Sequence, residues 1–134
     1  MGEHEGEMRA TSQPLQVSAE RRDAAGGQVA IVRAEGEVDL ANAEELSGAL
    51  RAAAGHEGGV VLDLREVPFM DSTGLKVILI ASRDLQAPLV VIAGAGSAVG
   101  RLLDLAGVAD RVPRFESEDE AFDALGSHGA ESPA

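Results

Sequence analysis

VVLDLREVPFMDSTGL, residues 60–75, places a buried strand directly before a helix. Its first five residues, VVLDL, are nearly all apolar, as a strand that is covered on both faces requires. Apolar residues then recur at helical spacing in Leu75, Ile78 and Leu79, so we expect a helix that begins near Ser72. A strand followed by a short connection and a helix is the repeating unit of α/β domains with parallel strands.

The same alternation between strand-like and helix-like spacing extends to both sides of this stretch. The expected elements lie near residues 15–19, 29–32, 43–53, 60–64, 72–85, 89–93, 99–106, 112–115 and 117–125. Their order, β-β-α-β-α-β-α-β-α, predicts a small α/β domain with a mixed sheet, parallel core strands and about four helices. Pro113 puts the last strand at a sheet edge, because proline has no N–H to donate. We expect Asn42 and Glu45 to start the first helix as a capping box.

A chain of 134 residues has room for one domain, which we expect at residues 14–125. Residues 1–13 are polar and acidic and show no periodicity, so they predict a flexible N-terminal tail. Residues 126–134, GSHGAESPA, are small and polar and predict a disordered C-terminal tail.

The composition narrows the classes of partner. Lys and Arg number 11 against 23 Asp and Glu, which gives a formal net charge of −12. Such a chain repels phosphate backbones and anionic lipids, so we expect neither nucleic acid nor a membrane as partner. The absence of cysteine excludes disulfides and thiol catalysis, and together with the absence of any signal-like apolar run it predicts a cytoplasmic protein. The charge and the scarcity of aromatic residues favour a monomer, and no metal or cofactor is expected.

The first candidate site is the helix start Asp71-Ser72-Thr73-Gly74. A structural interpretation makes Asp71 or Ser72 an ordinary N-cap. A functional interpretation makes the Ser72 hydroxyl a phosphate acceptor, since the free N–H groups and the dipole of a helix N-terminus favour an anion. Local spacing leaves both interpretations open.

Four segments in order give this chain a family resemblance. They are EGEVDL (35–40), the stretch VVLDL leading into FMDSTGL (60–75), SAVGRLLDLAGV (97–108) and RFES (114–117). Together they closely resemble the STAS domain of bacterial anti-sigma factor antagonists, over roughly residues 15–125. Because the chain keeps Ser72 and is too short for a fusion, it resembles the free-standing, phosphorylatable type.

The resemblance implies a switch and not an enzyme. In that family, the unphosphorylated antagonist binds an anti-sigma factor that is also a serine kinase, and so frees a sigma factor. The kinase phosphorylates the serine that corresponds to Ser72 and thereby releases the antagonist, and a serine phosphatase restores it.

The resemblance also implies a partner-binding surface, formed by Asp39 and by Asp71 to Leu75. Its expected members are Asp39, Asp71, Ser72, Thr73, Gly74 and Leu75. Asp39 corresponds to the acidic residue near the kinase-binding surface, although it could equally be a cap for the first helix. Asp71 could orient the Ser72 hydroxyl, and Thr73 could be a minor acceptor.

Two alternative functions remain open. Asp63, at a strand end, resembles the phosphoacceptor aspartate of a response-regulator receiver, but the acidic pair and the lysine that a receiver needs are missing. The turn with Gly94, Gly96 and Gly100 resembles a dinucleotide-binding motif in which the third glycine comes one residue late. A tight turn followed by a helix cap explains the same glycines.

Overall fold

The computed structural model describes residues 14–24, 27–53, 55 and 58–131, with residues 127–131 described through their backbone alone. The predicted N-terminal tail, residues 1–13, lies outside this range. The elements follow one another as β1 (Gln16–Ala24), β2 (Gly27–Glu35), α2 (Ala43–Ala52), β3 (Gly59–Glu66), α3 (Ser72–Asp84), β4 (Leu89–Ile92), α4 (Ala98–Ala106), β5 (Arg114–Phe115) and α5 (Glu118–Glu131). The predicted order is confirmed.

The five strands form one mixed sheet in the order β1-β2-β3-β4-β5. β1 runs antiparallel to β2, with Val17 opposite Ala34, and β2, β3, β4 and β5 run parallel to one another. β5 lies at the edge, as Pro113 predicted, and the Pro113 carbonyl accepts a hydrogen bond from the N–H of Val91 at 3.0 Å. The expected sheet, with parallel strands at its centre, is therefore confirmed.

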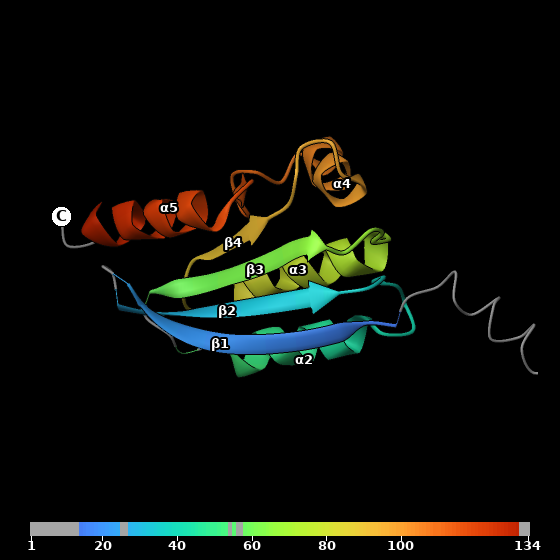
Figure 1. Cartoon of the computed structure of the whole chain (residues 1–134), viewed down its shortest axis with the longest axis horizontal. Coiled ribbons are helices and arrows are strands. Elements are labelled where there is room, and N and C mark those ends of the chain that lie inside the picture. The colour runs from blue at the N-terminus through green and yellow to red at the C-terminus, as the bar shows by residue number, and fades with distance from the viewer. Residues whose placement is uncertain (1–13, 25–26, 54, 56–57, 132–134) are drawn as a thin grey trace, which may run out of the picture.

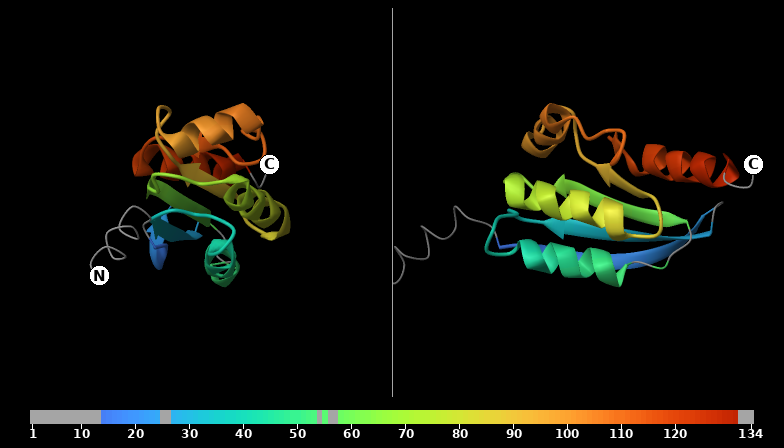
Figure 2. Two further views of the ribbon diagram at one scale, coloured as in Figure 1. Left: turned by 90° about the vertical axis from the view of Figure 1, so that its right-hand side faces the viewer. Right: turned by 180° about the vertical axis from the view of Figure 1, so that it is seen from behind.

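Helices cover both faces of the central strands. α2 and α3 lie on one face and α5 lies on the other (Figure 1; Figure 2). Successive residues of β3 point to opposite faces, so Leu62 joins the larger apolar cluster under α2 and α3, while Val61 joins the smaller one under α5. This two-sided burial explains why residues 60–64 are almost continuously apolar.

Two sequence predictions about helix ends need correction. The capping box of Asn42 and Glu45 is wrong, because the Asn42 side chain makes no cap hydrogen bond to α2. Its carbonyl oxygen accepts instead from the N–H of Asp39 at 2.9 Å, and its amide donates to the Glu37 carbonyl at 2.8 Å. The preceding loop thus competes successfully for the side chain that the cap would need.

The C-terminal boundary also lies later than predicted. α5 continues through Gly126 to Glu131, six residues past the expected limit at residue 125. Gly126 does not take the left-handed conformation that ends α4 at Gly107, where φ is +67°. A glycine inside a helix costs only about 1 kcal/mol, so it weakens the helix without stopping it. Among the described residues, no helix is long and apolar enough to cross a membrane.

Candidate functional site

Two loops meet at the carboxyl ends of β2 and β3, at the right of Figure 1. A single parallel bridge between Val38 and Met70 joins the loop after β2 to the loop after β3. The N–H of Val38 donates to the Phe69 carbonyl, and the N–H of Asp71 donates to the Val38 carbonyl, each at 3.1 Å. This bridge brings Asp39 beside the start of α3, so two predicted site segments that are distant in sequence come together.

Asp71 is the N-cap of α3, as the structural interpretation predicted. Its carboxylate accepts from the N–H of Thr73 at 2.8 Å and from the N–H of Gly74 at 3.4 Å. The carboxylate is therefore directed at the backbone and not at the Ser72 hydroxyl. It satisfies two of the N–H groups that an α-helix leaves without an intrahelical partner.

Ser72 is the first residue of α3, and its side chain is exposed. Within the described part of the chain, no hydrogen bond engages its hydroxyl. The hydroxyl is thus open to a reagent that approaches from solvent. A phosphate there would meet the positive end of the helix dipole, but it would also share that end with the Asp71 carboxylate.

The other members of the motif lie deeper. Thr73 and Leu75 are half-buried, and Leu75 packs against the larger apolar cluster. Gly74 is buried, and a Cβ at this position would fall within 2.9 Å of Val38 Cγ1 and closer still to the Met70 side chain. Gly74 therefore lets the first turn of α3 sit directly on the bridge between the two loops.

Asp39 shapes the turn that leads into α2. Its carboxylate accepts from the N–H of Ala41 at 3.0 Å, and its carbonyl accepts from the N–H groups of Asn42 and Ala43 at 3.1 and 2.9 Å. The side chain is half-buried. Its structural role is clear, and its predicted contact with a partner stays a prediction.

Two exposed apolar side chains flank these polar residues, and the sequence analysis missed both. Leu40 is 78% exposed and Phe69 is 50% exposed. The signal was available, because Phe69 is one of only three Phe in a chain that has no Trp or Tyr. We call the group formed by Asp39, Leu40, Phe69 and Ser72 the Ser72 surface.

The border of the Ser72 surface formed by the loop after β2 and the start of α2 is acidic, whereas the exposed Lys76 lies one turn after Ser72 on α3. Residues 36–45 contain Glu37, Asp39, Glu44 and Glu45 and no Lys or Arg. Within the described ranges, these and the other acids form no group that could hold a metal ion. The Ser72 surface therefore suits a partner that is apolar at its centre and basic at its rim.

The receiver alternative fails on the surroundings of Asp63. This side chain is only 5% exposed, and its carboxylate accepts from the Arg65 side chain at 3.0 and 2.7 Å. Arg33 Nε lies 3.6 Å away. Burial alone would raise the pKa of Asp63, but the hydrogen bonds from Arg65 and the charge of Arg33 hold that pKa below its usual value. A carboxylate enclosed in this way is not poised to receive phosphate.

Asp63 belongs to an ion-pair cluster on the α5 side of the sheet. Its members are Glu20, Arg22, Arg33, Asp63, Arg65 and Glu118. Glu118, in the first turn of α5, pairs with Arg33 at 2.6 Å and with Arg22 at 3.1 Å. The hydrogen bond from Arg33, and then that from Arg22, lower the pKa of Glu118. The cluster thus fastens the start of α5 to β1, β2 and β3.

The dinucleotide alternative fails on the glycine turn. Ser97 Oγ accepts from the N–H of Gly100 at 3.0 Å and donates to the Gly94 carbonyl at 2.7 Å, so the turn closes on itself. A Cβ at position 100 would collide with that same carbonyl, which explains the glycine without a ligand. The strand order β1-β2-β3-β4-β5 also lacks the reversal at which dinucleotides bind in open parallel sheets.

Comparison with known proteins decides the family. A family model of the STAS domain matches residues 17–121. The chain belongs to the STAS domain family. The match covers all five strands of the sheet, except for Gln16 at the start of β1, and the whole Ser72 surface.

Solved structures resemble this STAS domain along most of its length. An anti-sigma factor antagonist from Mycobacterium paratuberculosis is 28% identical, with a TM-score of 0.69 over 82% of this chain and 94% of that one. A putative anti-sigma factor antagonist from Thermotoga maritima is 17% identical, with a TM-score of 0.63 over 80% and 93%. The Bacillus protein SpoIIAA in its phosphorylated form is 18% identical, with a TM-score of 0.52 over 84% and 99%. The last two show the shared fold alone.

Proposed function

We propose that this STAS domain is an anti-sigma factor antagonist whose binding is controlled by phosphorylation of Ser72. The observation that carries the proposal is the exposed Ser72 hydroxyl at the first position of α3, beside the exposed Leu40 and Phe69. The 28% identical antagonist from Mycobacterium paratuberculosis supports the class of partner.

In the unphosphorylated state, an anti-sigma factor covers the Ser72 surface. Leu40 and Phe69 supply the apolar area that is removed from water, about 25 cal/mol for each Å² buried. Basic side chains of the anti-sigma factor face the acids at the rim, which speeds encounter and fixes orientation. The anti-sigma factor, once occupied in this way, releases its sigma factor.

Phosphorylation then ends the complex. The anti-sigma factor acts as a serine kinase: the Ser72 oxygen attacks the γ-phosphorus of ATP, ADP leaves, and the hydroxyl proton passes to a base on the kinase. The product carries about −1.5 to −2 extra charges next to Asp71 and close to Asp39. In the complex this charge would lie at the apolar centre of the interface, away from the basic rim of the partner, and it would replace the Ser72 hydroxyl contact. The cost of taking the phosphate out of water there lowers the affinity, by roughly a hundredfold or more. A serine phosphatase hydrolyses the ester and restores the antagonist.

The switch needs no refolding of the domain. Asp71 already caps α3, and the bridge between Val38 and Met70 is made of backbone hydrogen bonds that do not involve the Ser72 side chain. The phosphate is added to an exposed position, so the fold stays as it is and the interface changes. The chain itself catalyses no step of this cycle.

The test is phosphate transfer from an anti-sigma factor kinase and ATP, with the modified residue mapped by mass spectrometry. We expect one phosphate on Ser72 in the wild-type chain and none in Ser72→Ala. The matched control is Ser47→Ala, which removes a hydroxyl from the α2 surface and should leave the incorporation unchanged. Full incorporation into Ser72→Ala, or a base-labile label on Asp63, would refute the proposal.

A further inference from the structure

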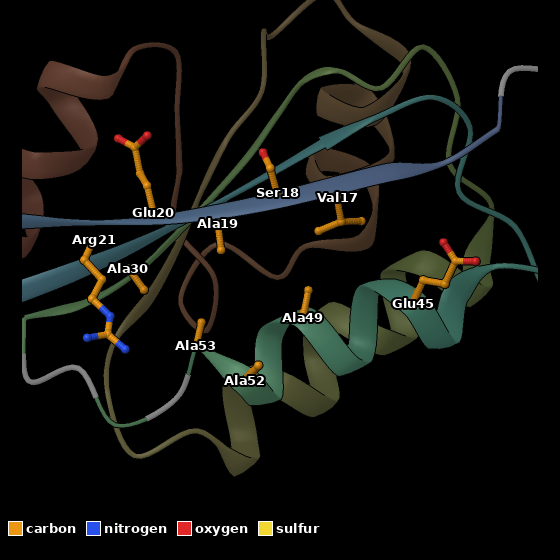
Figure 3. A pocket seen from close by; sticks show the side chains of 10 residues that line it. All are labelled: Val17, Ser18, Ala19, Glu20, Arg21, Ala30, Glu45, Ala49, Ala52 and Ala53. Atoms are coloured by element: carbon orange, nitrogen blue, oxygen red, sulfur yellow. The ribbon is translucent and has the colours of Figure 1, made fainter.

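A groove runs between the free edge of the sheet and helix α2. β1 is an edge strand of nine residues, and among the described residues no strand pairs with its outer edge. Val17 and Ala19 of β1 point toward Ala49 of α2 and toward Ala53, the residue after α2, across an open space (Figure 3). These small side chains leave the space unfilled, and the groove measures about 550 Å³.

The two ends of the groove carry opposite charges. Arg21 lies at one end, beyond Ala19, and Glu45 lies at the other end, near Val17 (Figure 3). Both side chains are exposed. Within the described part of the chain, neither of them forms an ion pair. The groove therefore has a positive end at Arg21 and a negative end at Glu45. An occupant that fits it must place a negative charge near Arg21 and a positive charge near Glu45.

A second copy of this chain can place its charges in this way. We propose that two copies pair through their β1 strands, antiparallel to each other, around a twofold axis at Ala19. In a twofold dimer, each contact occurs twice with the roles of the copies exchanged. The antiparallel arrangement turns the second β1 end for end, so Arg21 of each copy arrives at the Glu45 end of the other copy's groove.

Hydrogen bonding fixes which residues face the free edge. Ala24 lies opposite Gly27, with only two residues between them, so this pair closes the β1–β2 ladder as a hydrogen-bonded pair. Arg22, Glu20 and Ser18, which precede Ala24 at intervals of two residues, form hydrogen-bonded pairs with β2 in the same way. The N–H and C=O groups of Val17, Ala19 and Arg21 are therefore directed to the free edge, where a second β1 can pair with them.

Charge then selects the register. An axis at Glu20 would place Glu20 opposite its own copy, and an axis at Arg21 would do the same for Arg21. Like charges directly opposite each other destabilise a sheet. An axis at Ala19 sets Arg21 opposite Val17 and Glu20 opposite Ser18, and it gives the longest ladder of the described residues without a like-charge pair.

The net charge of −12 predicted a monomer, but that charge acts weakly at a distance. At about 0.15 M salt, charges more than about 8 Å apart are largely screened. The local pairing of Arg21 with Glu45 and the new ladder of backbone hydrogen bonds therefore decide the contact. Two strands separate β3, and with it Phe69 and Ser72, from the dimer axis, so the dimer leaves these two residues uncovered while it engages Glu45 of the acidic border.

Sedimentation equilibrium of the full chain, from about 1 to about 500 µM at about 0.15 M salt, tests this proposal. We expect a reversible dimer for the wild-type chain. Arg21→Glu and Glu45→Arg should each weaken it at least about tenfold, because each change places two like-charge contacts across the axis. The double variant R21E/E45R restores the opposite-charge pairs and should return the dissociation constant to within about threefold of wild type.

The matched control is Glu44→Arg, which makes the same charge change one residue away, in the first turn of α2 but outside the groove. It should leave the dimer unchanged, and circular dichroism verifies that all variants are folded. A wild-type chain that stays monomeric at the highest concentration would overturn the proposal and leave the groove to another protein. A double variant that fails to recover, or a control as weak as Glu45→Arg, would overturn it equally.

Discussion

Substitution of Gly74 by Ala tests the role that the structure gives to this buried glycine. A Cβ at position 74 would lie 2.7 Å from Met70 Sδ and 2.9 Å from Val38 Cγ1, both well inside van der Waals contact. Met70 and Val38 are themselves buried, and Val38 is β-branched and stiff. The first turn of α3 must therefore move away from the bridge between the two loops, or the bridge must open.

Two opposing effects set the magnitude. Alanine in place of glycine favours a helix by about 1 kcal/mol. Forcing a methyl group into a well-packed site costs about 1 to 3 kcal/mol. At position 74 the packing cost exceeds the gain in helix propensity, because both the Met70 and the Val38 side chains must move to admit the methyl group. The difference is a net loss of up to about 2 kcal/mol in the free energy of unfolding, which lowers the Tm by up to about 10 °C.

Thermal unfolding followed by circular dichroism measures this difference. Gly48→Ala is the matched control, because Gly48 lies inside α2 and a Cβ there meets nothing within 4 Å. The control should raise the free energy of unfolding by up to about 1 kcal/mol. If Gly74→Ala proves as stable as the wild type or more so, the packing argument is wrong and the glycine has another role.

Three further predictions concern the site and the ion-pair cluster. Phosphorylation of Ser72 should shift backbone NMR signals only near residues 70–78, and widespread shifts would indicate a conformational switch instead. Ser72→Asp should weaken partner binding only in part, because aspartate is shorter and carries less charge than phosphoserine. Asp39→Ala should lower the free energy of unfolding by about 1 kcal/mol, because it breaks the turn before α2. It should lower the free energy of binding to the anti-sigma factor by more than that. Equal losses of the two free energies would mean that Asp39 has a structural role only. The lowered pKa values of Asp63 and Glu118 mean that both carboxylates stabilise the fold above about pH 4, and that this stabilisation disappears as the pH falls through their folded-state values. Thermal unfolding between neutral and acid pH checks this, and Asp63→Asn should flatten the decline.

The elements that the sequence predicted correctly are those whose cause is local. Residues 60–64 are apolar on both faces because helices cover both faces of β3, and that pattern is visible in five consecutive letters. Asp71 caps α3 and Gly107 ends α4 through contacts within four residues. Propensity and periodicity describe such short-range interactions well.

The features that the sequence did not predict depend on residues far apart in the chain. Glu118 forms an ion pair with Arg22, which lies 96 positions earlier in the chain, and the local sequence around either residue does not indicate this pairing. The groove beside β1 exists only because the edge strand and α2 both present small side chains to one another. Asn42 and Glu45 have the spacing of a capping box, but the Asn42 side chain accepts a hydrogen bond from the N–H of Asp39 in the preceding loop instead.

The bridge between Val38 and Met70 has a consequence for how this family diversifies. Its two hydrogen bonds join main-chain atoms, and the side chains that pack beneath it are those of the buried Val38 and Met70. Leu40 and Phe69 project from those loops into solvent, so they can be exchanged for other residues while Ser72 keeps its place. If this surface binds an anti-sigma factor as proposed, related STAS domains can change which partner they recognise by changing two exposed side chains, without altering the backbone scaffold that presents Ser72.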